Sequence, residues 1–238
     1  MSTGSSALPV DAGRSGGVAG RRGGGIATRP AGVVEPFRDA AQQADAATLG
    51  MWLFLATEML FFGVLFFAYG LARAAMPEAF AAASRETSFL LGTGNTAVLL
   101  TSSFTMAAAV RAAQLRSHGT AALLLLLTAV LGLAFAGIKL TEYGLDYRHH
   151  LVPVLDFAFD PRLARGALLF FWLYFTTTGL HLVHLTIGVV LALTFAWREW
   201  RRRTARLHEQ VEIVGLYWHF VDLVWIFLYP CLYLVSRA

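Results

Sequence analysis

Five long apolar runs follow one another along the chain, at about 49–71, 88–112, 120–141, 167–197 and 212–235. Each run can cross a bilayer as a helix, because a helix rises about 1.5 Å per residue and the hydrocarbon layer is roughly 30 Å thick. The fourth run is longer than a span needs, so that helix must tilt or project beyond the lipid. The pattern predicts an all-α membrane protein in which residues 49–238 form a bundle of five transmembrane helices.

Residues 1–48 differ from the rest of the chain. Nine glycines fall within the first 32 positions, with arginines scattered among them. A segment of this kind cannot bury enough apolar surface to offset the entropy of ordering, so it predicts a disordered, Gly/Arg-rich N-terminal arm. The arm lacks the apolar segment of a cleavable signal peptide, and we expect the first span to serve as the insertion signal.

The composition supports the membrane assignment. The 238 residues are 57% hydrophobic and 14% charged, and a soluble domain of this length could not hide all the apolar runs in one core. The single cysteine, Cys231, excludes a disulfide framework. The net charge of +4 comes largely from arginines at predicted helix ends. We therefore expect no nucleic-acid partner.

The distribution of basic residues predicts the orientation. If the N-terminus is inside, twelve Lys and Arg residues fall in the inner segments 1–48, 111–119 and 198–211. Six fall in the outer segments 72–87, 142–166 and 236–238. This bias favours an N-inside, C-outside topology. The segment 142–166 is then a loop on the outer face, and we expect His149 and His150 to be solvated there.

Several ionisable residues lie inside the predicted spans, where a charge costs roughly 2.5–3.5 kcal/mol on insertion scales. Glu58 is near the middle of the first span, His181 and His184 are midway along the fourth, and His219 and Asp222 are in the inner half of the fifth. Steps of three or four residues put each pair on one helix face. We expect a polar seam inside the bundle, where Glu58 meets the histidines.

The residues alone leave three interpretations of this seam open. Histidine and carboxylate groups can satisfy each other and lock the bundle. Glu58 and Glu142 with the histidines could instead hold a metal, or His219 could face His181 across a haem, although the Glu-x-x-His pair of di-iron proteins is absent. The third interpretation is a proton path or an ion transporter, but the spans lack the broken helices typical of transporters.

Other polar residues have simpler explanations. Lys139 and Glu142 are one turn apart near the outer end of the third span. Their spacing predicts a lysine that snorkels to the interface beside a carboxylate, with Tyr143 in the aromatic belt. Asn95, in the outer part of the second span, is expected to cap or bridge helices.

Four stretches of this chain carry distinctive motifs. Tyr217 to Trp225 has the pattern Y-W-H-F-V-D-x-V-W, and Thr178 to Gly188 has T-G-x-H-x-x-H-x-x-x-G. Trp52 to Gly63 has W-L-F-L-x-T-E-x-x-F-F-G, and the third span ends in an E-Y pair. Together these stretches resemble motifs of subunit III of the haem–copper oxidases, most of all cytochrome c oxidase subunit III. Besides Glu58, His181, His184, His219 and Asp222, the motif residues are Trp52, Gly63, Glu142, Tyr143, Gly179, Gly188, Trp218 and Trp225.

The resemblance implies an accessory subunit with no catalytic residue, no metal ligand and no cofactor of its own. In the family such a subunit packs on subunit I, in one complex with subunit II, and those partners carry the haem and copper. It holds structural phospholipid, supports proton uptake and protects the catalytic core. The resemblance assigns Glu58, His181, His184, His219 and Asp222 to proton-path support or lipid organisation. It also implies a multi-pass location in a bacterial inner membrane.

The chain departs from the family pattern in two ways. Many members have seven spans, in which two early helices form one arm of a lipid-filled cleft, whereas this chain resembles the short bacterial form. We expect the cleft to be incomplete unless another subunit supplies helices. Lys139 stands where a glutamine is expected before the E-Y pair. The alternatives are a quinol oxidase subunit III, an accessory protein of a nitric oxide reductase, a haem-binding electron carrier and an ion transporter.

Overall fold

The computed structural model describes residues 40–153, 155, 157–201 and 207–234. The elements in this part of the chain are α1 (Ala40–Ala75), α2 (Pro77–Glu86), α3 (Phe89–Gln114), α4 (His118–Arg148), α5 (Ala164–Trp200), α6 (Leu207–Tyr229) and the π-helical turn η1 (Pro230–Leu234). Within the described ranges, five helices are long and apolar enough to cross a membrane. The predicted all-α, five-helix membrane fold is confirmed.

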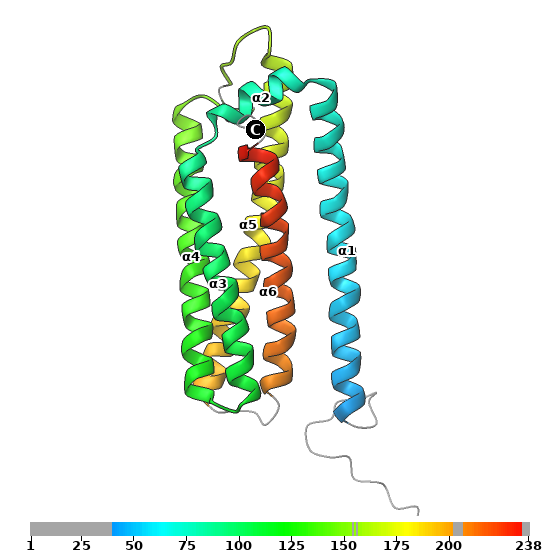
Figure 1. Ribbon diagram of the computed structural model, residues 1–238, viewed down its shortest axis with the longest axis vertical. Coiled ribbons are helices and arrows are strands. Elements are labelled where there is room, and N and C mark those ends of the chain that lie inside the picture. Colours follow the sequence, from blue (N-terminus) through cyan, green and yellow to red (C-terminus); the bar gives the residue numbers. More distant parts are fainter. Residues whose placement is uncertain (1–39, 154, 156, 202–206, 235–238) are drawn as a thin grey trace, which may run out of the picture.

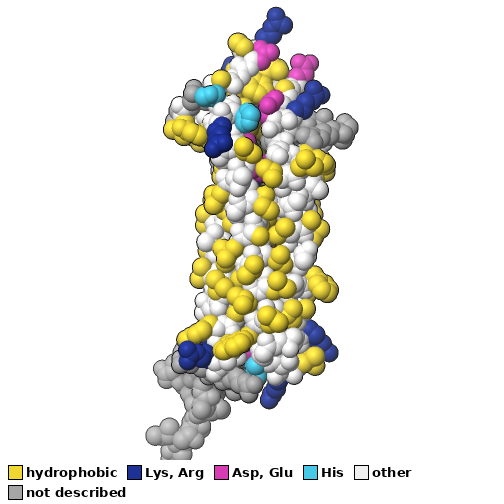
Figure 2. All heavy atoms as spheres, turned by 90° about the vertical axis from the view of Figure 1, so that its left-hand side faces the viewer, with side chains coloured by type: hydrophobic (Ala, Val, Ile, Leu, Met, Phe, Trp, Pro, Cys, Tyr) yellow, Lys and Arg dark blue, Asp and Glu magenta, His cyan; other side chains and the backbone are white. Residues whose placement is uncertain are grey.

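Helices α3, α4, α5 and α6 form a compact group, α1 stands beside it, and α2 lies across one end (Figure 1). We call the end that carries α2 the α2 end, and the opposite end, where α3 turns into α4, the α3–α4 end. On the face shown in Figure 2, hydrophobic side chains cover the middle and Lys and Arg lie at the two ends. This distribution suits a protein whose middle faces hydrocarbon.

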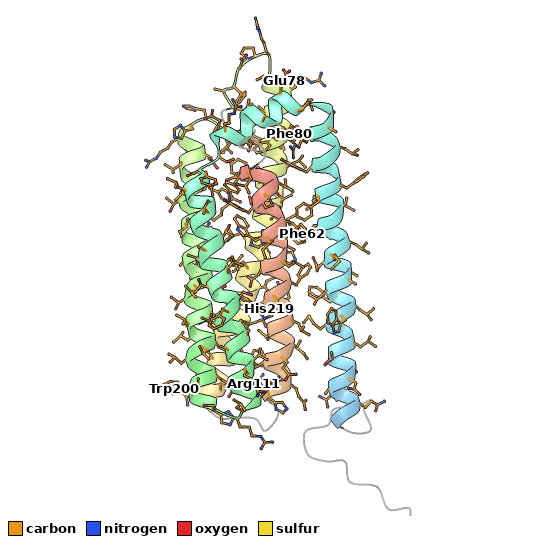
Figure 3. All side chains as sticks on the ribbon, in the orientation of Figure 1. Phe62, Glu78, Phe80, Arg111, Trp200 and His219 are labelled. Carbon is orange, nitrogen blue, oxygen red and sulfur yellow. The ribbon has the colours of Figure 1, made fainter. Side chains whose placement is uncertain are left out.

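Helix α1 meets the bundle along a narrow strip. Its buried large side chains are Leu55, Phe62 and Tyr69, which are 6%, 2% and 5% exposed. They are seven residues apart, which is the spacing that keeps one face of a helix against its neighbour. Phe62 points from α1 into the space beside α6 (Figure 3), where its ring lies 6.4 Å from that of Phe220. The other sides of α1 present apolar side chains outward.

The motif residue Trp218 shows why the four-helix group packs closely. It is fully buried on α6 between Gly132 of α4 and Gly188 of α5. A Cβ atom at Gly132 would lie 2.8 Å from the indole, and one at Gly188 would lie 3.0 Å from it. A Cβ at Gly132 would clash, and one at Gly188 would be tighter than most real contacts, so the two glycines make room for the tryptophan.

The helix ends differ from the predicted ones at two places. Helix α1 begins at Ala40, so residues 40–48, which we assigned to the disordered arm, are helical. This segment is rich in alanine and glutamine, which favour helix. Residues 1–39 lie outside the described residues. At the other place, α4 continues to Arg148, so the predicted loop 142–166 is shorter than expected and begins after that residue.

Helix α2 was not predicted, because the segment 72–87 was treated only as an outer segment between two spans. It begins with Pro77 at a first-turn position, where proline costs no hydrogen bond. Its buried residues are Ala79, Phe80, Ala83 and Ser84. Gly166 allows α2 to approach α5, because a Cβ there would lie 2.4 Å from the Cβ of Ala79.

Candidate functional site

Glu58 of α1 pairs with His184 of α5 across the strip that joins α1 to the bundle. The distance from Glu58 Oε2 to His184 Nε2 is 3.1 Å. The two side chains are 20% and 14% exposed, so the pair is partly covered. The predicted meeting of Glu58 with a histidine of this helix is confirmed for His184.

The hydrogen bonds of His184 define how many protons the pair holds. Its Nδ1 lies 2.8 Å from the carbonyl oxygen of Leu180. Because a carbonyl only accepts, Nδ1 must carry hydrogen. Nε2 then either accepts from a protonated Glu58 or donates to its carboxylate. In both cases one proton lies between Oε2 and Nε2, and the pair has no net charge.

Aromatic groups from α1 and α6 hold His184 in place. The ring of Phe62 meets the imidazole edge-on, with centroids 5.4 Å apart. Tyr217 donates to the backbone carbonyl of His184 at 2.9 Å. The pair therefore lies where α1, α5 and α6 meet, inside the membrane-spanning part of the fold.

His181 does not join this pair, although it is only three residues from His184. It is 1% exposed, and its ring lies 5.5 Å from that of Phe135 and 5.1 Å from that of Trp225. Neither ring nitrogen has a hydrogen-bond partner among the described residues. The prediction that both histidines meet Glu58 is wrong for His181, because a step of three residues turns its side chain toward the core.

The two predicted site residues of α6, His219 and Asp222, also do not pair with each other or with Glu58. His219 lies in the half of α6 nearer the α3–α4 end (Figure 3), and its Nδ1 is 2.9 Å from Ser103 Oγ on α3. Asp222 is 3% exposed, and its carboxylate oxygens have no hydrogen-bond partner within the described ranges. No single polar seam therefore unites the predicted residues.

No metal centre is visible among these groups. The described residues contain no group of three or more His, Cys, Asp or Glu side chains that could hold a metal ion. His181 contacts Phe135 and Trp225, whereas His219 contacts Ser103. The two histidines thus have different neighbours on different sides of α6.

The most extensive polar network surrounds Lys139, nearer the α2 end. The side chain is 0% exposed, and Nζ donates to Glu142 Oε2 at 3.0 Å, Tyr174 Oη at 2.8 Å and Tyr233 Oη at 2.6 Å. These bonds use all three hydrogens of a charged ammonium. The prediction of a snorkelling lysine is wrong, because α5 and η1 supply acceptors that keep it inside.

The two tyrosines that accept from Lys139 donate in turn to carboxylates. Tyr233 donates to Glu142, with its Oη 2.8 Å from Oε1 and 3.0 Å from Oε2. Tyr174 donates to Asp146 Oδ2 at 3.2 Å. We call Lys139, Glu142, Asp146, Tyr174 and Tyr233 the lysine network. It connects α4, α5 and η1 through side chains that are all buried.

Aromatic rings enclose the charged end of Lys139. Its Nζ lies 4.3 Å from the ring centroid of Tyr174, 5.1 Å from Tyr143, 5.3 Å from Tyr233 and 5.7 Å from Trp225. Ring faces attract cations, and the attraction grows when water is excluded. The motif residues Tyr143 and Trp225 therefore help to accommodate the lysine that departs from the family pattern.

Sequence reasoning missed most of this network. Asp146, Tyr174 and Tyr233 were not singled out, although Asp146 stands one turn after Glu142, which was a usable signal. It also missed a second carboxylate–histidine pair at the α3–α4 end. There His118 Nδ1 of α4 lies 2.6 Å from Glu199 Oε2 of α5.

The remaining predicted residues lie in varied surroundings. Asn95 is buried, but its amide has no hydrogen-bond partner among the described residues, so the expected capping or bridging bond is wrong. His149 and His150 are exposed, as predicted. Trp52 is 57% exposed. A Cβ at Gly63 or Gly179 would meet nothing within 4 Å, so these two motif glycines face open space in the isolated chain.

Known proteins resemble this chain over most of its length. Cytochrome c oxidase subunit 3 of Thermostichus vulcanus is 32% identical over 203 residues, which cover 83% of this chain and 92% of that protein. The subunit 3 of Alkalihalophilus pseudofirmus is 29% identical over 87% of this chain and 98% of its own. Cytochrome bo(3) ubiquinol oxidase subunit 3 of Pseudomonas aeruginosa is 31% identical over 79% and 84%.

The family description "Cytochrome c oxidase subunit III" matches residues 38–237 of this chain. The match includes every described helix from α1 to η1. It also includes the Glu58–His184 pair and the whole lysine network. This chain is therefore a multi-pass membrane protein of the cytochrome c oxidase subunit III family.

Proposed function

We propose that this chain is a non-catalytic accessory subunit of a proton-pumping haem–copper oxidase in aerobic respiratory electron transport. It packs on subunit I, in one complex with subunit II, and those partners carry the haem and copper. The complex lies in a bacterial inner membrane, with the N-terminus of this chain inside. Family membership supports this proposal, and so do the apolar side chains that α1 directs away from the bundle.

The observation that carries the proposal is the Glu58–His184 pair. It shares one proton inside the membrane-spanning part of the fold, between α1 and the bundle. The pair is partly exposed, so a neighbouring subunit or a lipid acyl chain can reach it. We infer that it supports proton uptake by subunit I or orders phospholipid between α1 and the bundle.

A quinol oxidase is the second candidate. The relative from Pseudomonas aeruginosa is named as a subunit of a ubiquinol oxidase and is 31% identical to this chain, close to the 32% of the Thermostichus vulcanus protein. The electron donor is a property of the partner subunits. Oxidation of reduced cytochrome c or of ubiquinol by the purified complex distinguishes the two candidates.

Affinity purification of the tagged chain from its native membrane tests the assignment of partners and cofactors. We expect a haem-containing subunit I to co-purify, and the separated chain to show no Soret band. A Soret band that stays with this polypeptide would favour the haem-carrier interpretation. Recovery of the chain alone, with ion conductance in vesicles, would favour a transporter.

Glu58→Gln tests the role of the pair, because a glutamine amide can still donate to His184 Nε2 but cannot share its proton. We expect the complex to assemble normally, and either to pump fewer protons per electron or to lose activity sooner during turnover. Glu199→Gln is the matched control, since it makes the same change in the other Glu–His pair. A wild-type number of protons pumped per electron and a wild-type rate of activity loss in the Glu58 variant would show that the pair is only a packing contact.

A further inference from the structure

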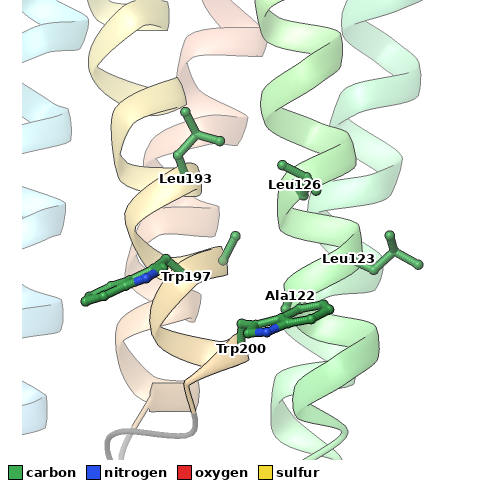
Figure 4. A pocket seen from close by; sticks show the side chains of 7 residues that line it. Ala122, Leu123, Leu126, Leu193, Trp197 and Trp200 are labelled. Atoms are coloured by element: carbon green, nitrogen blue, oxygen red, sulfur yellow. The ribbon is translucent and has the colours of Figure 1, made fainter.

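A second feature lies away from both polar sites, in a groove between α4 and α5 at the α3–α4 end. The groove has a volume of about 240 Å³, and apolar side chains of α4 and α5 line it (Figure 4). These side chains belong to Ala122, Leu123, Leu126, Leu193, Ala196, Trp197 and Trp200. The indoles of Trp197 and Trp200 are 51% and 74% exposed, so two large rings stand at its edge.

A positive charge lies over one of the lining residues. The guanidinium of Arg201 lies over the indole of Trp197, 5.5 Å from the ring centroid. Arg202 and Arg203 follow directly in the sequence. The nearest acid along the helix, Glu199, is 1% exposed and bonded to His118. Its charge is therefore directed into the protein and away from Arg201.

The size and charge of the groove favour one kind of occupant. A helix with its side chains is about 10–12 Å across, which is too wide for a groove of 240 Å³. An acyl chain is narrow and apolar, and it fits the lining. A guanidinium binds phosphate oxygens through two parallel N–H groups, and tryptophan prefers the level of lipid headgroups.

We propose that this groove binds an anionic phospholipid, with one acyl chain between α4 and α5 and the headgroup phosphate on Arg201. The site is separate from the strip between α1 and the bundle, where the proposed function places lipid or a proton route. Its occupancy does not depend on an oxidase partner. The ligand is recognised by a net negative headgroup, because the nearest carboxylate along α5, that of Glu199, is buried against His118 and does not attract an ammonium group to this site.

Tryptophan fluorescence of the full chain in lipid vesicles tests this proposal. The vesicles consist of phosphatidylcholine with a minor fraction of phosphatidylglycerol, and the bromine label is placed on the acyl chains of one lipid or the other. Bromine quenches only nearby indoles, so all vesicle measurements use a Trp52→Phe/Trp172→Phe background, which removes the two other exposed indoles of the described residues. Trp197 and Trp200 then report on the groove. We expect brominated phosphatidylglycerol to associate about five-fold more strongly than brominated phosphatidylcholine, which is the effect of one basic residue near a membrane surface.

Variants separate a built site from diffuse attraction to a basic surface. Arg201→Gln should remove the preference for phosphatidylglycerol, and Ala196→Leu should lower quenching by both lipids by filling the floor of the groove. Arg198→Gln is the matched control, because it removes the same charge from a guanidinium that lies over Phe195, outside the groove. Equal quenching by the two lipids in the wild-type chain, or equal loss of preference in Arg198→Gln and Arg201→Gln, would overturn the proposal.

Discussion

Replacing Lys139 with methionine removes the only cation of the lysine network and keeps most of the side-chain volume. In the native fold Nζ donates three hydrogen bonds, at 2.6 Å, 2.8 Å and 3.0 Å. Lys139→Met leaves the Glu142 carboxylate buried at 0% exposure, with the hydroxyl of Tyr233 as its remaining partner. We expect a marked loss of stability from this one substitution.

The magnitude follows from the burial of the pair. Three bonds from a charged donor, at about 1.5–3 kcal/mol each, give an upper limit near 5–9 kcal/mol. Lysine also loses its hydration when it is buried, and methionine does not, so the net cost is smaller. Buried ion pairs broken on one side lose about 3–5 kcal/mol. We expect the free energy of unfolding of Lys139→Met to fall by that amount.

Titration of the purified chain from mild detergent into SDS, followed by circular dichroism, measures this free energy. In the double variant Lys139→Met/Glu142→Gln the amide oxygen still accepts from Tyr233, and the unpaired charge at position 142 is gone. The loss of unfolding free energy in the double variant should therefore be smaller than the sum of the losses in Lys139→Met and Glu142→Gln, by about 2 kcal/mol or more. A loss below about 1 kcal/mol in Lys139→Met, or additive losses in the double variant, would refute the argument that the lysine is a charged partner of Glu142.

Three further predictions concern packing, the arm and topology. Gly166→Ala places a Cβ 2.4 Å from a side chain of α2, so it should lower the free energy of unfolding by about 1–3 kcal/mol in the same titration. Gly137→Ala is the control, because its Cβ meets nothing within 4 Å. This control should be neutral or stabilising by up to about 1 kcal/mol. Deletion of residues 1–39 should leave assembly and oxidase activity nearly intact in purified membranes, and failure to assemble would identify the arm as a docking segment. In the N-inside topology, a membrane-impermeant thiol reagent added outside intact cells should label His149→Cys and spare Ser117→Cys, and the reverse pattern would overturn the orientation.

The sequence by itself determined the class of fold and the family. Length and apolarity alone force each of the five runs to cross a membrane, because water offers no other place for so much apolar surface. The motif stretches around Glu58, His184 and Trp218 were likewise readable without coordinates. The pairing of Glu58 with His184 could be predicted, since a lone carboxyl in the membrane needs a partner and helical spacing placed a histidine on a shared face.

The tertiary structure decided which polar residues meet. His181 and His184 differ by three residues, which is about 60° short of a full turn, and that angle was enough to send one into the aromatic core and the other to α1. The position of Lys139 depended on Tyr174 and Tyr233, which are 35 and 94 residues away in the chain. Spacing along one helix cannot show whether another helix supplies hydrogen-bond acceptors to a lysine or whether the lysine side chain extends to water. Only the packing of α4 against α5 and η1 settled that the charge lies inside.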